Sequence, residues 1–286
     1  MANPSLKTSL QAGDFILAPG VFDLISALIA DRAGFPALYV TGYGTVASYL
    51  GLPDAGIATY RDMIERIAQI VKMTKTPVIA DADTGYGGLL NVRHTVRGYE
   101  DAGVSAIQIE DQEFPKKCGH TPGRRVIRME DMVRKIEVAV ESRRSDDFLI
   151  IARTDARTTL GLDEAIRRGK AYHAAGADIV FVESPESEDE MRRIAESIDA
   201  PLFANMVNGG RTPILPAEKL KEIGFSVAIH PAIGFLAAGA ALQKAYADLK
   251  DNGITSPEID LYSFAEFNKL LGFEDVWDFE RRYAEI

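Results

Sequence analysis

Residues 78–110, VIADADTGYGGLLNVRHTVRGYEDAGVSAIQIE, contain the pattern that decides the fold. They start with a short apolar run, pass through a Gly-rich turn, continue with a helix-period segment at 91–101 and end in a second apolar run at 106–110. Gly103 follows the helical segment, where glycine commonly ends a helix in the left-handed conformation. A buried strand, a helix and another buried strand in this order predict a β-α-β unit with parallel strands.

The same alternation recurs along the chain. Apolar, β-branched runs of strand length occur at 15–18, 37–41, 78–81, 106–110, 148–153, 179–183, 202–205 and 227–230. Helix-period segments between them include 60–72, 91–101, 130–144, 162–174 and 188–198. Eight buried strands alternating with helices predict an α/β fold of the (β/α)8 TIM-barrel type. The alternative is an open doubly wound sheet, but no GxGxxG motif follows an early strand to favour it.

The C-terminal part of the chain extends beyond the eighth unit. We predict one barrel domain over residues 1–286, with 256–286 as a helical extension. The last helical pattern carries Trp277, Phe279 and Tyr283. An aromatic helix must bury its apolar face on its own barrel or on a neighbouring subunit, so this pattern indicates an oligomer.

Composition excludes several classes of protein. The length of 286 residues suits a barrel, which takes about 250 residues as one unit. A net charge of −10 argues against nucleic acid and against anionic membrane surfaces as partners. A single cysteine permits no intramolecular disulfide. The N-terminus has no apolar signal segment, and no apolar run reaches the length of about 20 residues that a bilayer requires. We expect a cytoplasmic protein; a mitochondrial form whose transit peptide has been removed is the alternative.

Polar side chains follow six successive predicted strands. Four of them are acidic: Asp81, Asp83, Glu110 and Glu183. The carboxyl ends of barrel strands share one face, so these carboxylates would converge there and repel one another. A hard divalent cation relieves that repulsion, and oxygen ligands point to Mg2+ or Mn2+. Each residue alone could cap a helix or form a buried ion pair, but their coincidence favours a site.

The loop after the fourth strand, residues 110–126, EDQEFPKKCGHTPGRRV, contains the only cysteine, Cys118. Its basic neighbours would stabilise the thiolate: Lys116, Lys117, His120, Arg124 and Arg125. The cysteine could be a nucleophile, a general acid or base, or inert. A long charged loop at a barrel mouth can also close over a substrate and exclude water.

These motifs resemble those of the isocitrate lyase and phosphoenolpyruvate mutase superfamily, and most closely its short-chain lyases. The resemblance extends from Pro19 to the C-terminal tail. It rests on five motifs: Lys116-Lys-Cys-Gly-His120, which is specific to the lyases, Asp81-Ala-Asp83, Gly51-Leu-Pro-Asp54, Ala152-Arg-Thr-Asp155 and Asn205-Met206.

The resemblance implies roles for individual residues. Asp81 and Asp83 would hold Mg2+ (Mn2+ is possible), directly or through water, with Asp54 and Glu110 in the outer coordination sphere. Thr41, Gly42 and Tyr43 resemble a loop that binds a substrate carboxylate through backbone N–H groups. The full set of expected substrate contacts is Thr41, Gly42, Tyr43, Asp81, Cys118, Gly119, His120, Arg153, Glu183 and Asn205. The expected catalytic residues are Cys118, Tyr39, Arg153, Lys117 and His120.

The implied reaction is cleavage of a carbon–carbon bond in a small 2-hydroxy dicarboxylate. The metal would stabilise the alkoxide, whose collapse to a carbonyl releases a 2-oxo acid such as pyruvate. The other fragment leaves as an enediolate, which the basic loop would stabilise. Cys118 is the expected acid that protonates its carbon.

The segment after the eighth strand bears on the substrate. Isocitrate and methylisocitrate lyases bind a third carboxylate through arginines, one of them five residues after the proline that follows this strand. Here that proline is Pro231 and the fifth residue on is Leu236; residues 232–239 have no basic side chain, and 261–265 offers no second arginine. A buried carboxylate without a cation is costly, so we favour 2,3-dimethylmalate, split to pyruvate and propionate.

Three alternatives remain open at this point: a 2-methylisocitrate lyase whose arginine is displaced in sequence, an oxaloacetate acetylhydrolase, and a non-catalytic barrel protein. The resemblance also implies a homotetramer, built as a dimer of dimers in which C-terminal helices are exchanged between subunits.

Overall fold

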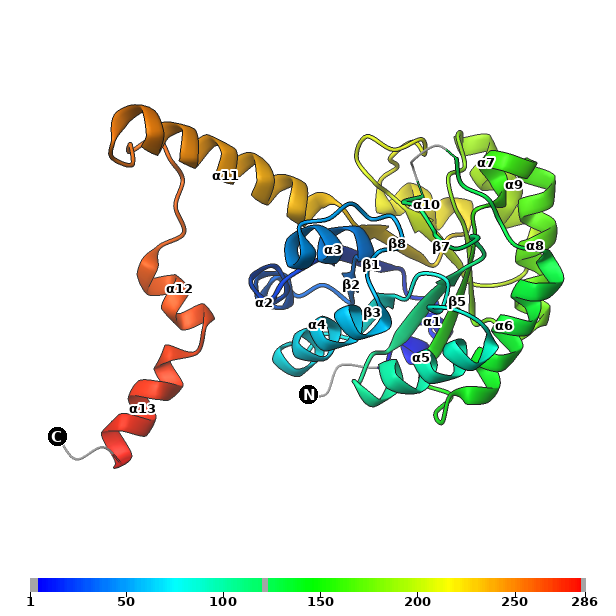
Figure 1. Cartoon of the computed structure of the whole chain (residues 1–286), viewed down its shortest axis with the longest axis horizontal. Coiled ribbons are helices and arrows are strands. Elements are labelled where there is room, and N and C mark those ends of the chain that lie inside the picture. The colour runs from blue at the N-terminus through cyan, green and yellow to red at the C-terminus, as the bar shows by residue number, and fades with distance from the viewer. Residues whose placement is uncertain (1–4, 120–122, 284–286) are drawn as a thin grey trace. The chain divides into compact units, whose positions relative to one another are not determined.

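The computed structural model describes residues 5–119 and 123–283. Its parallel strands form a closed barrel in chain order, and β8 pairs with β1 to complete it (Figure 1). The strands are β1 (Ile16–Val21), β2 (Leu38–Val40), β3 (Val78–Asp81), β4 (Ala106–Glu110), β5 (Leu149–Thr154), β6 (Ile179–Val182), β7 (Leu202–Asn205) and β8 (Val227–His230). The predicted (β/α)8 TIM barrel is therefore confirmed.

Helices follow the strands and surround the barrel (Figure 1). Those up to the eighth strand are α1 (Leu6–Gln11), α2 (Leu24–Ala33), α3 (Gly42–Leu50), α4 (Tyr60–Met73), α5 (Leu89–Asp101), α6 (Met129–Ser142), α7 (Ala156–Leu160), α8 (Leu162–Ala174), α9 (Glu188–Ser197) and α10 (Ala217–Ile223). Local sequence sets many of their ends: Asp23 forms a capping box with Ser26 at the start of α2, and Gly34 ends it with φ 78°.

Two boundaries differ from the predictions in ways that matter. The first strand, predicted over 15–18, spans Ile16–Val21 and so continues through Pro19 and Gly20. Gly20 lies so close to the backbone of Pro231 that a β-carbon there would overlap it, so only glycine permits this approach of β1 to the end of β8. Residues 42–50 form helix α3, whereas the sequence had indicated a loop for Thr41–Tyr43.

The barrel interior is filled by alternate residues of the strands. The buried inner cluster comprises Leu6, Ile16, Ala18, Ala37, Tyr39, Ile79, Ala106, Leu149, Ile151, Ile179, Phe181, Phe203, Val227 and Ile229. Successive side chains of a strand point to opposite faces, so the residue two positions further along a strand points inward as well. That rule directs Asp81, Glu110, Arg153, Glu183 and Asn205 into the carboxyl-terminal mouth of the barrel.

The chain divides into two compact units, Met1–Phe235 and Leu236–Ile286. The predicted extension started at residue 256, whereas the second unit begins at Leu236, within α11 (Ile233–Asn252). It also contains α12 (Phe264–Leu270) and α13 (Phe273–Tyr283). Its large apolar side chains are mostly exposed, including Tyr246, Phe264, Trp277, Phe279 and Tyr283. Among the helices in the described ranges, none has the length and apolar character needed to span a bilayer.

Candidate active site

Five inward-pointing polar residues meet at the carboxyl-terminal mouth of the barrel. Arg153 Nη1 lies 3.4 Å from Glu110 Oε2, and Arg153 Nη2 lies 3.4 Å from Glu183 Oε2. Asn205 Nδ2 donates to Glu183 Oε2 at 3.0 Å. Asp81, from the neighbouring strand β3, is 7% exposed, and Glu110 and Glu183 are almost fully buried. The structure thus brings together the predicted residues of strands β4 to β7, with Asp81 beside them.

Arg153 is held in a fixed orientation by two groups. Its Nε and Nη2 donate to the two carboxylate oxygens of Asp155, each at 2.9 Å, in a bidentate ion pair. The guanidinium carbon lies 5.1 Å from the centre of the Phe181 ring. Burial alone would lower the pKa of Arg153, but Asp155, Glu110 and Glu183 raise it well above its ordinary value. The arginine is therefore a permanent, rigidly placed positive charge.

Glu110 is the carboxylate whose surroundings best fit a cation or an ordered water. Its Oε1 is buried and has no hydrogen-bond partner among the described residues. Burial raises the pKa of Glu110 well above its usual range, against the opposing effect of Arg153. A buried carboxylate oxygen without a donor is costly, so a ligand at this position would stabilise the folded chain.

Asp83 and Asp54 share one lysine. Lys116 Nζ lies 2.5 Å from Asp54 Oδ1 and 2.6 Å from Asp83 Oδ1, and all three side chains are buried. Burial alone would lower the pKa of Lys116, but Asp83 and Asp54 raise it well above its usual value. Two of the four carboxylates expected around a metal thus contact an ammonium group in this structure. Across the described residues, no cluster of three or more His, Cys, Asp or Glu could hold a metal ion.

The backbone N–H of Asp83 binds the Asp81 carboxylate. Asp83 has a φ of 49°, in the left-handed region that non-glycine residues seldom adopt. In this conformation its N–H donates to Asp81 Oδ1 at 3.0 Å. The other oxygen, Asp81 Oδ2, faces Gly42, where an added β-carbon would lie only 2.5 Å away. The sequence DAD therefore positions one carboxylate for the mouth and directs the second toward Lys116.

The start of α3 lies beside Asp81. Thr41 is the N-cap of this helix, and its hydroxyl accepts from Gly44 N at 3.5 Å. N–H groups in the first turn of a helix have no partner within the helix and favour anions. The predicted loop of Thr41, Gly42 and Tyr43 is therefore corrected to a helix N-terminus, which still offers backbone donors. The Tyr43 ring stacks on Phe235, with ring centres 5.2 Å apart.

Tyr39 projects into the barrel below this mouth. Its hydroxyl donates to Gln108 Oε1 at 3.0 Å. Burial, reinforced by the charge of Asp81, raises the pKa of Tyr39 well above its usual range. Tyr39 therefore keeps its proton at neutral pH.

The loop after β4 reaches the same mouth. Cys118 is half-buried, and its N–H donates to the carbonyl oxygen of Asp54 at 3.2 Å. A β-carbon on Gly119 would lie 3.1 Å from Glu183 Oε2 and would overlap Arg153, so only glycine fits at that point. Lys117 is exposed, and its backbone exchanges two hydrogen bonds with the Gln112 side chain. His120 lies outside the described residues.

Long-range contacts fix the two arms of this loop. Gln112 and Val126 form an isolated antiparallel bridge at its base. On the returning arm, Arg124 Nη1 donates to Asp155 Oδ1 at 2.6 Å and Nη2 donates to Thr158 Oγ1 at 2.7 Å. Asp155 therefore binds both Arg153 and the loop, which links the position of the loop to that of the site arginine.

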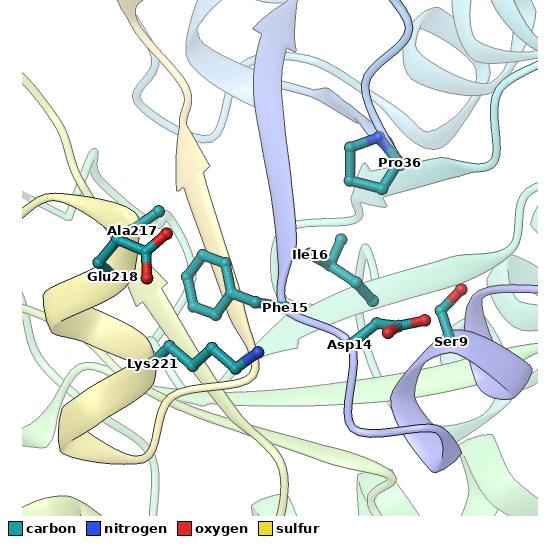
Figure 2. A pocket seen from close by; sticks show the side chains of 8 residues that line it. All are labelled: Ser9, Asp14, Phe15, Ile16, Pro36, Ala217, Glu218 and Lys221. Carbon is teal, nitrogen blue, oxygen red and sulfur yellow. The ribbon is translucent and has the colours of Figure 1, made fainter.

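A pocket of about 570 Å³ lies at the opposite end of the barrel (Figure 2). Its lining residues come from α1, from the segments that lead into β1 and β2, and from α10: Ser9, Asp14, Phe15, Ile16, Pro36, Ala217, Glu218 and Lys221. These positions precede the strands or mark their first residues. In α/β barrels that face supports stability, whereas chemistry occurs at the carboxyl ends of the strands.

Comparison with known proteins identifies the family. The family model described as phosphoenolpyruvate phosphomutase matches residues 6–250. The chain is 48% identical over 280 residues to 2,3-dimethylmalate lyase of Eubacterium barkeri, with 98% of this chain and 97% of that protein covered. The chain belongs to the phosphoenolpyruvate mutase/isocitrate lyase superfamily. It is also 42% identical over 282 residues to 2-methylisocitrate lyase of Aeropyrum pernix, covering 98% of this chain and 90% of the relative.

Solved structures of superfamily members agree with this assignment. A crystal structure of 2,3-dimethylmalate lyase matches with a TM-score of 0.92 and 38% identity, covering 99% of this chain and 95% of the other. Oxaloacetate acetylhydrolase matches with a TM-score of 0.92 and 34% identity, covering 98% and 96%. Phosphonopyruvate hydrolase in complex with oxalate and Mg++ matches with a TM-score of 0.89 and 32% identity over the full length of both chains. The predicted family is thus confirmed.

Sequence reasoning missed four residues that shape the site. It counted Lys116 and Arg124 only as charges near the cysteine, and it assigned no role to Gln108 or Asp155. Asp155 could have been found, because it stands two residues after Arg153 in the same motif. The contacts of Lys116 and Gln108 reach residues more than 60 positions away along the chain, so no local pattern indicates them.

Replacing Lys116 should destabilise the protein far more than replacing an exposed cation of the same loop. Lys116→Met leaves Asp54 and Asp83 buried without their shared cation, a change that typically costs about 3–5 kcal/mol. The control, Arg125→Met, removes an exposed ion pair with Glu113, worth about 1 kcal/mol or less. Denaturant unfolding at neutral pH measures both. Equal free energies of unfolding for the two variants would show that the buried pairs contribute little.

Proposed function

We propose that this chain is a magnesium-dependent carbon–carbon lyase that cleaves a 2-hydroxy dicarboxylate, with 2,3-dimethylmalate as the favoured substrate and pyruvate and propionate as products. One observation carries the proposal: Gly119 of the cysteine-bearing loop lies against Arg153 and Glu183, so the loop joins the polar mouth of the barrel. The similarity to 2,3-dimethylmalate lyase, at 48% identity over nearly the whole chain, supports the choice of substrate.

Asp81 and Glu110 are the residues that would hold Mg2+, with Asp83 and Asp54 acting from further out. This exchanges the roles that the resemblance implied for Asp83 and Glu110, because Asp83 contacts Lys116 in this structure. The fit rests on the buried Glu110 Oε1, which has no hydrogen-bond partner within the part of the chain that the structure describes, and on Asp81 Oδ2, which lies beside Gly42. One or two carboxylates, completed by waters and substrate oxygens, are a usual magnesium site, so a three-residue cluster is not required. When bound, magnesium supplies a Lewis acid that lowers the pKa of the substrate hydroxyl. A related phosphonopyruvate hydrolase has been solved with oxalate and Mg++. Mn2+ would satisfy the same oxygen ligands.

The protein groups bind and orient the substrate. Backbone N–H groups at the start of α3 would bind one carboxylate next to Asp81. Arg153, fixed by Asp155, would bind the oxygens at the hydroxyl end, and Glu183 and Asn205 would line the same side. Tyr39 retains its proton and would hold its hydroxyl near the reacting centre.

The cleavage balances without a cosubstrate. The 2-hydroxyl would release its proton to solvent, from which the Cys118 thiolate would later regain one. The bond between carbons 2 and 3 would break, and its electron pair would remain on carbon 3 as the enediolate of propionate. Cys118 would donate a proton to carbon 3, and the other fragment, which contains carbon 2, would leave as pyruvate. Lys117 and His120, from the same loop, would add positive charge around the departing enediolate.

The segment after β8 bears on which dicarboxylate is the substrate. Residues 232–239 have no basic side chain, so a third carboxylate has no evident cation in that segment. This disfavours 2-methylisocitrate, although a relative at 42% identity is a 2-methylisocitrate lyase. Oxaloacetate hydrolysis is the second candidate function, because oxaloacetate acetylhydrolase shares the fold with a TM-score of 0.92. A non-catalytic barrel is disfavoured by the buried charged groups at the mouth. Burying charge lowers the stability of the fold, and a protein without catalytic activity would not need these groups.

Product analysis tests the substrate directly. With Mg2+ present, 2,3-dimethylmalate, 2-methylisocitrate, isocitrate and oxaloacetate are offered separately, and pyruvate, succinate, glyoxylate, acetate and oxalate are quantified. We expect pyruvate from 2,3-dimethylmalate and no pyruvate when the metal is chelated. Pyruvate with succinate from 2-methylisocitrate would contradict the missing-cation argument, and oxalate with acetate from oxaloacetate would establish the hydrolase.

Cys118→Ser should abolish turnover while leaving the fold intact. Serine is nearly isosteric, but its hydroxyl is a far weaker acid than a thiol, so we expect a loss of at least about 100-fold in kcat. Circular dichroism and Mg2+ binding should remain as in the wild type. Lys117→Met serves as a neighbouring control whose effect should be smaller. Near-normal turnover of Cys118→Ser would exclude the thiol as the acid.

We also propose a cytoplasmic homotetramer, a dimer of dimers with exchanged C-terminal helices. The second unit, residues 236–286, exposes aromatic side chains that a single chain leaves in water, and α11 and α13 have no buried residue. Light scattering after size-exclusion chromatography should give about four times 31.2 kDa, whereas a mass of 31.2 kDa would rule out the tetramer. Trp277→Ser should shift the mass toward smaller species.

A further inference from the structure

Gln108 is a polar residue among the apolar side chains that fill the barrel. It lies on β4 between Ala106 and Glu110, is fully buried and pairs in register with Asp81 on one side and Ile151 on the other. A buried primary amide costs free energy unless its donors and acceptor are bonded. Its presence at this depth therefore calls for a physical reason.

Two hydrogen bonds, one at the carbonyl and one at the NH2 group, determine the orientation of the amide. The Tyr39 hydroxyl donates to Gln108 Oε1 at 3.0 Å, and Gln108 Nε2 donates to Asp81 Oδ1 at 3.4 Å. An ionised carboxylate only accepts, so the NH2 group must face Asp81 and the carbonyl must face Tyr39. The flipped amide would place two oxygens against each other. The tyrosine proton is in turn directed away from Asp81.

Asp81 Oδ1 thus receives two donors, Gln108 Nε2 and the backbone N–H of Asp83. Both donors bind the same oxygen, Oδ1, and they hold the carboxylate plane so that Oδ2 faces the start of α3 at Gly42. Partners of this kind fix the direction in which a carboxylate presents its remaining oxygen to a cation.

We propose that Gln108 is a positioning residue for the proposed metal-dependent reaction: it couples Tyr39 to Asp81 and sets the orientation in which Asp81 Oδ2 is offered to the divalent cation. The inference rests on the proposed function, since it concerns the same site. Gln108 would act without touching the substrate. Tyr39 would help to orient Asp81 through Gln108, a role separate from any direct proton transfer.

The test measures metal binding without substrate. Gln108→Met keeps the side-chain volume but removes both hydrogen bonds, and Mn2+ binding is followed by electron paramagnetic resonance. We expect Mn2+ affinity to fall about 10- to 100-fold, the range observed when partners of metal ligands are replaced. The fall in kcat for 2,3-dimethylmalate should exceed the change in KM. Ile151→Met, at the paired position of β5, controls for altered barrel packing and should change Mn2+ affinity less than about threefold.

The outcomes distinguish failure of the Gln108 positioning role from failure of the proposed lyase function. Mn2+ affinity of Gln108→Met equal to that of Ile151→Met would overturn the positioning role while leaving the lyase proposal intact. Wild-type protein that binds no Mn2+ and cleaves no dicarboxylate would overturn the proposed function, and this inference with it. If Gln108→Met does not fold, Gln108→Asn replaces it: the amide is retained but is one methylene too short to span both partners, so Mn2+ affinity should fall in the same way.

Discussion

A closed barrel of parallel strands leaves its side chains only two directions, inward and outward, and they alternate along every strand. Every second residue of a strand therefore points into the interior. Ile79, Ile151 and Phe181 lie in the apolar core in this way. Asp81, Arg153 and Glu183, two positions further along the chain, point into the mouth by the same alternation. The site is the continuation of the core by two residues on each strand. Its geometry inherits the rigidity of the barrel, which flexible loops alone would not provide.

Buried charge at this mouth is stable because nearly every group has an opposite charge in contact. Asp155 binds Arg153 and Arg124, and Lys116 binds Asp54 and Asp83. Behind them, Asp111 accepts hydrogen bonds from Arg168, Tyr172 and Thr154. Removing any one partner would leave a charge in a low-dielectric interior. Glu110 Oε1 departs from this pattern, which is why a cation or a water is expected there.

The superfamily uses one scaffold for lysis, hydrolysis and phosphoryl chemistry, as the names of the matched relatives indicate. The fold therefore limits the reaction less than the residues that close the mouth do. In this chain the residues at the mouth include Gly119 of the Cys118 loop, next to Arg153, and the stacked rings of Tyr43 and Phe235 lie at the start of α3. The aromatic pair gives the start of α3 an apolar neighbour.

The sequence alone determined the approximate strands and the strand-end residues Asp81, Glu110, Arg153, Glu183 and Asn205, because these depend on local periodicity: buried strands are short apolar runs, and polar groups at strand ends share a face. It also identified the family through the motif at 116–120. The pairing of β8 with β1 closes the barrel. The tertiary structure decided which charges pair. Lys116 contacts Asp54 across 62 positions, and Tyr39 contacts Gln108 across 69, distances over which composition and spacing carry no signal. It likewise converted Thr41–Tyr43 from a loop into a helix start and extended β1 past Pro19 and Gly20, where Gly20 lies against the backbone of Pro231.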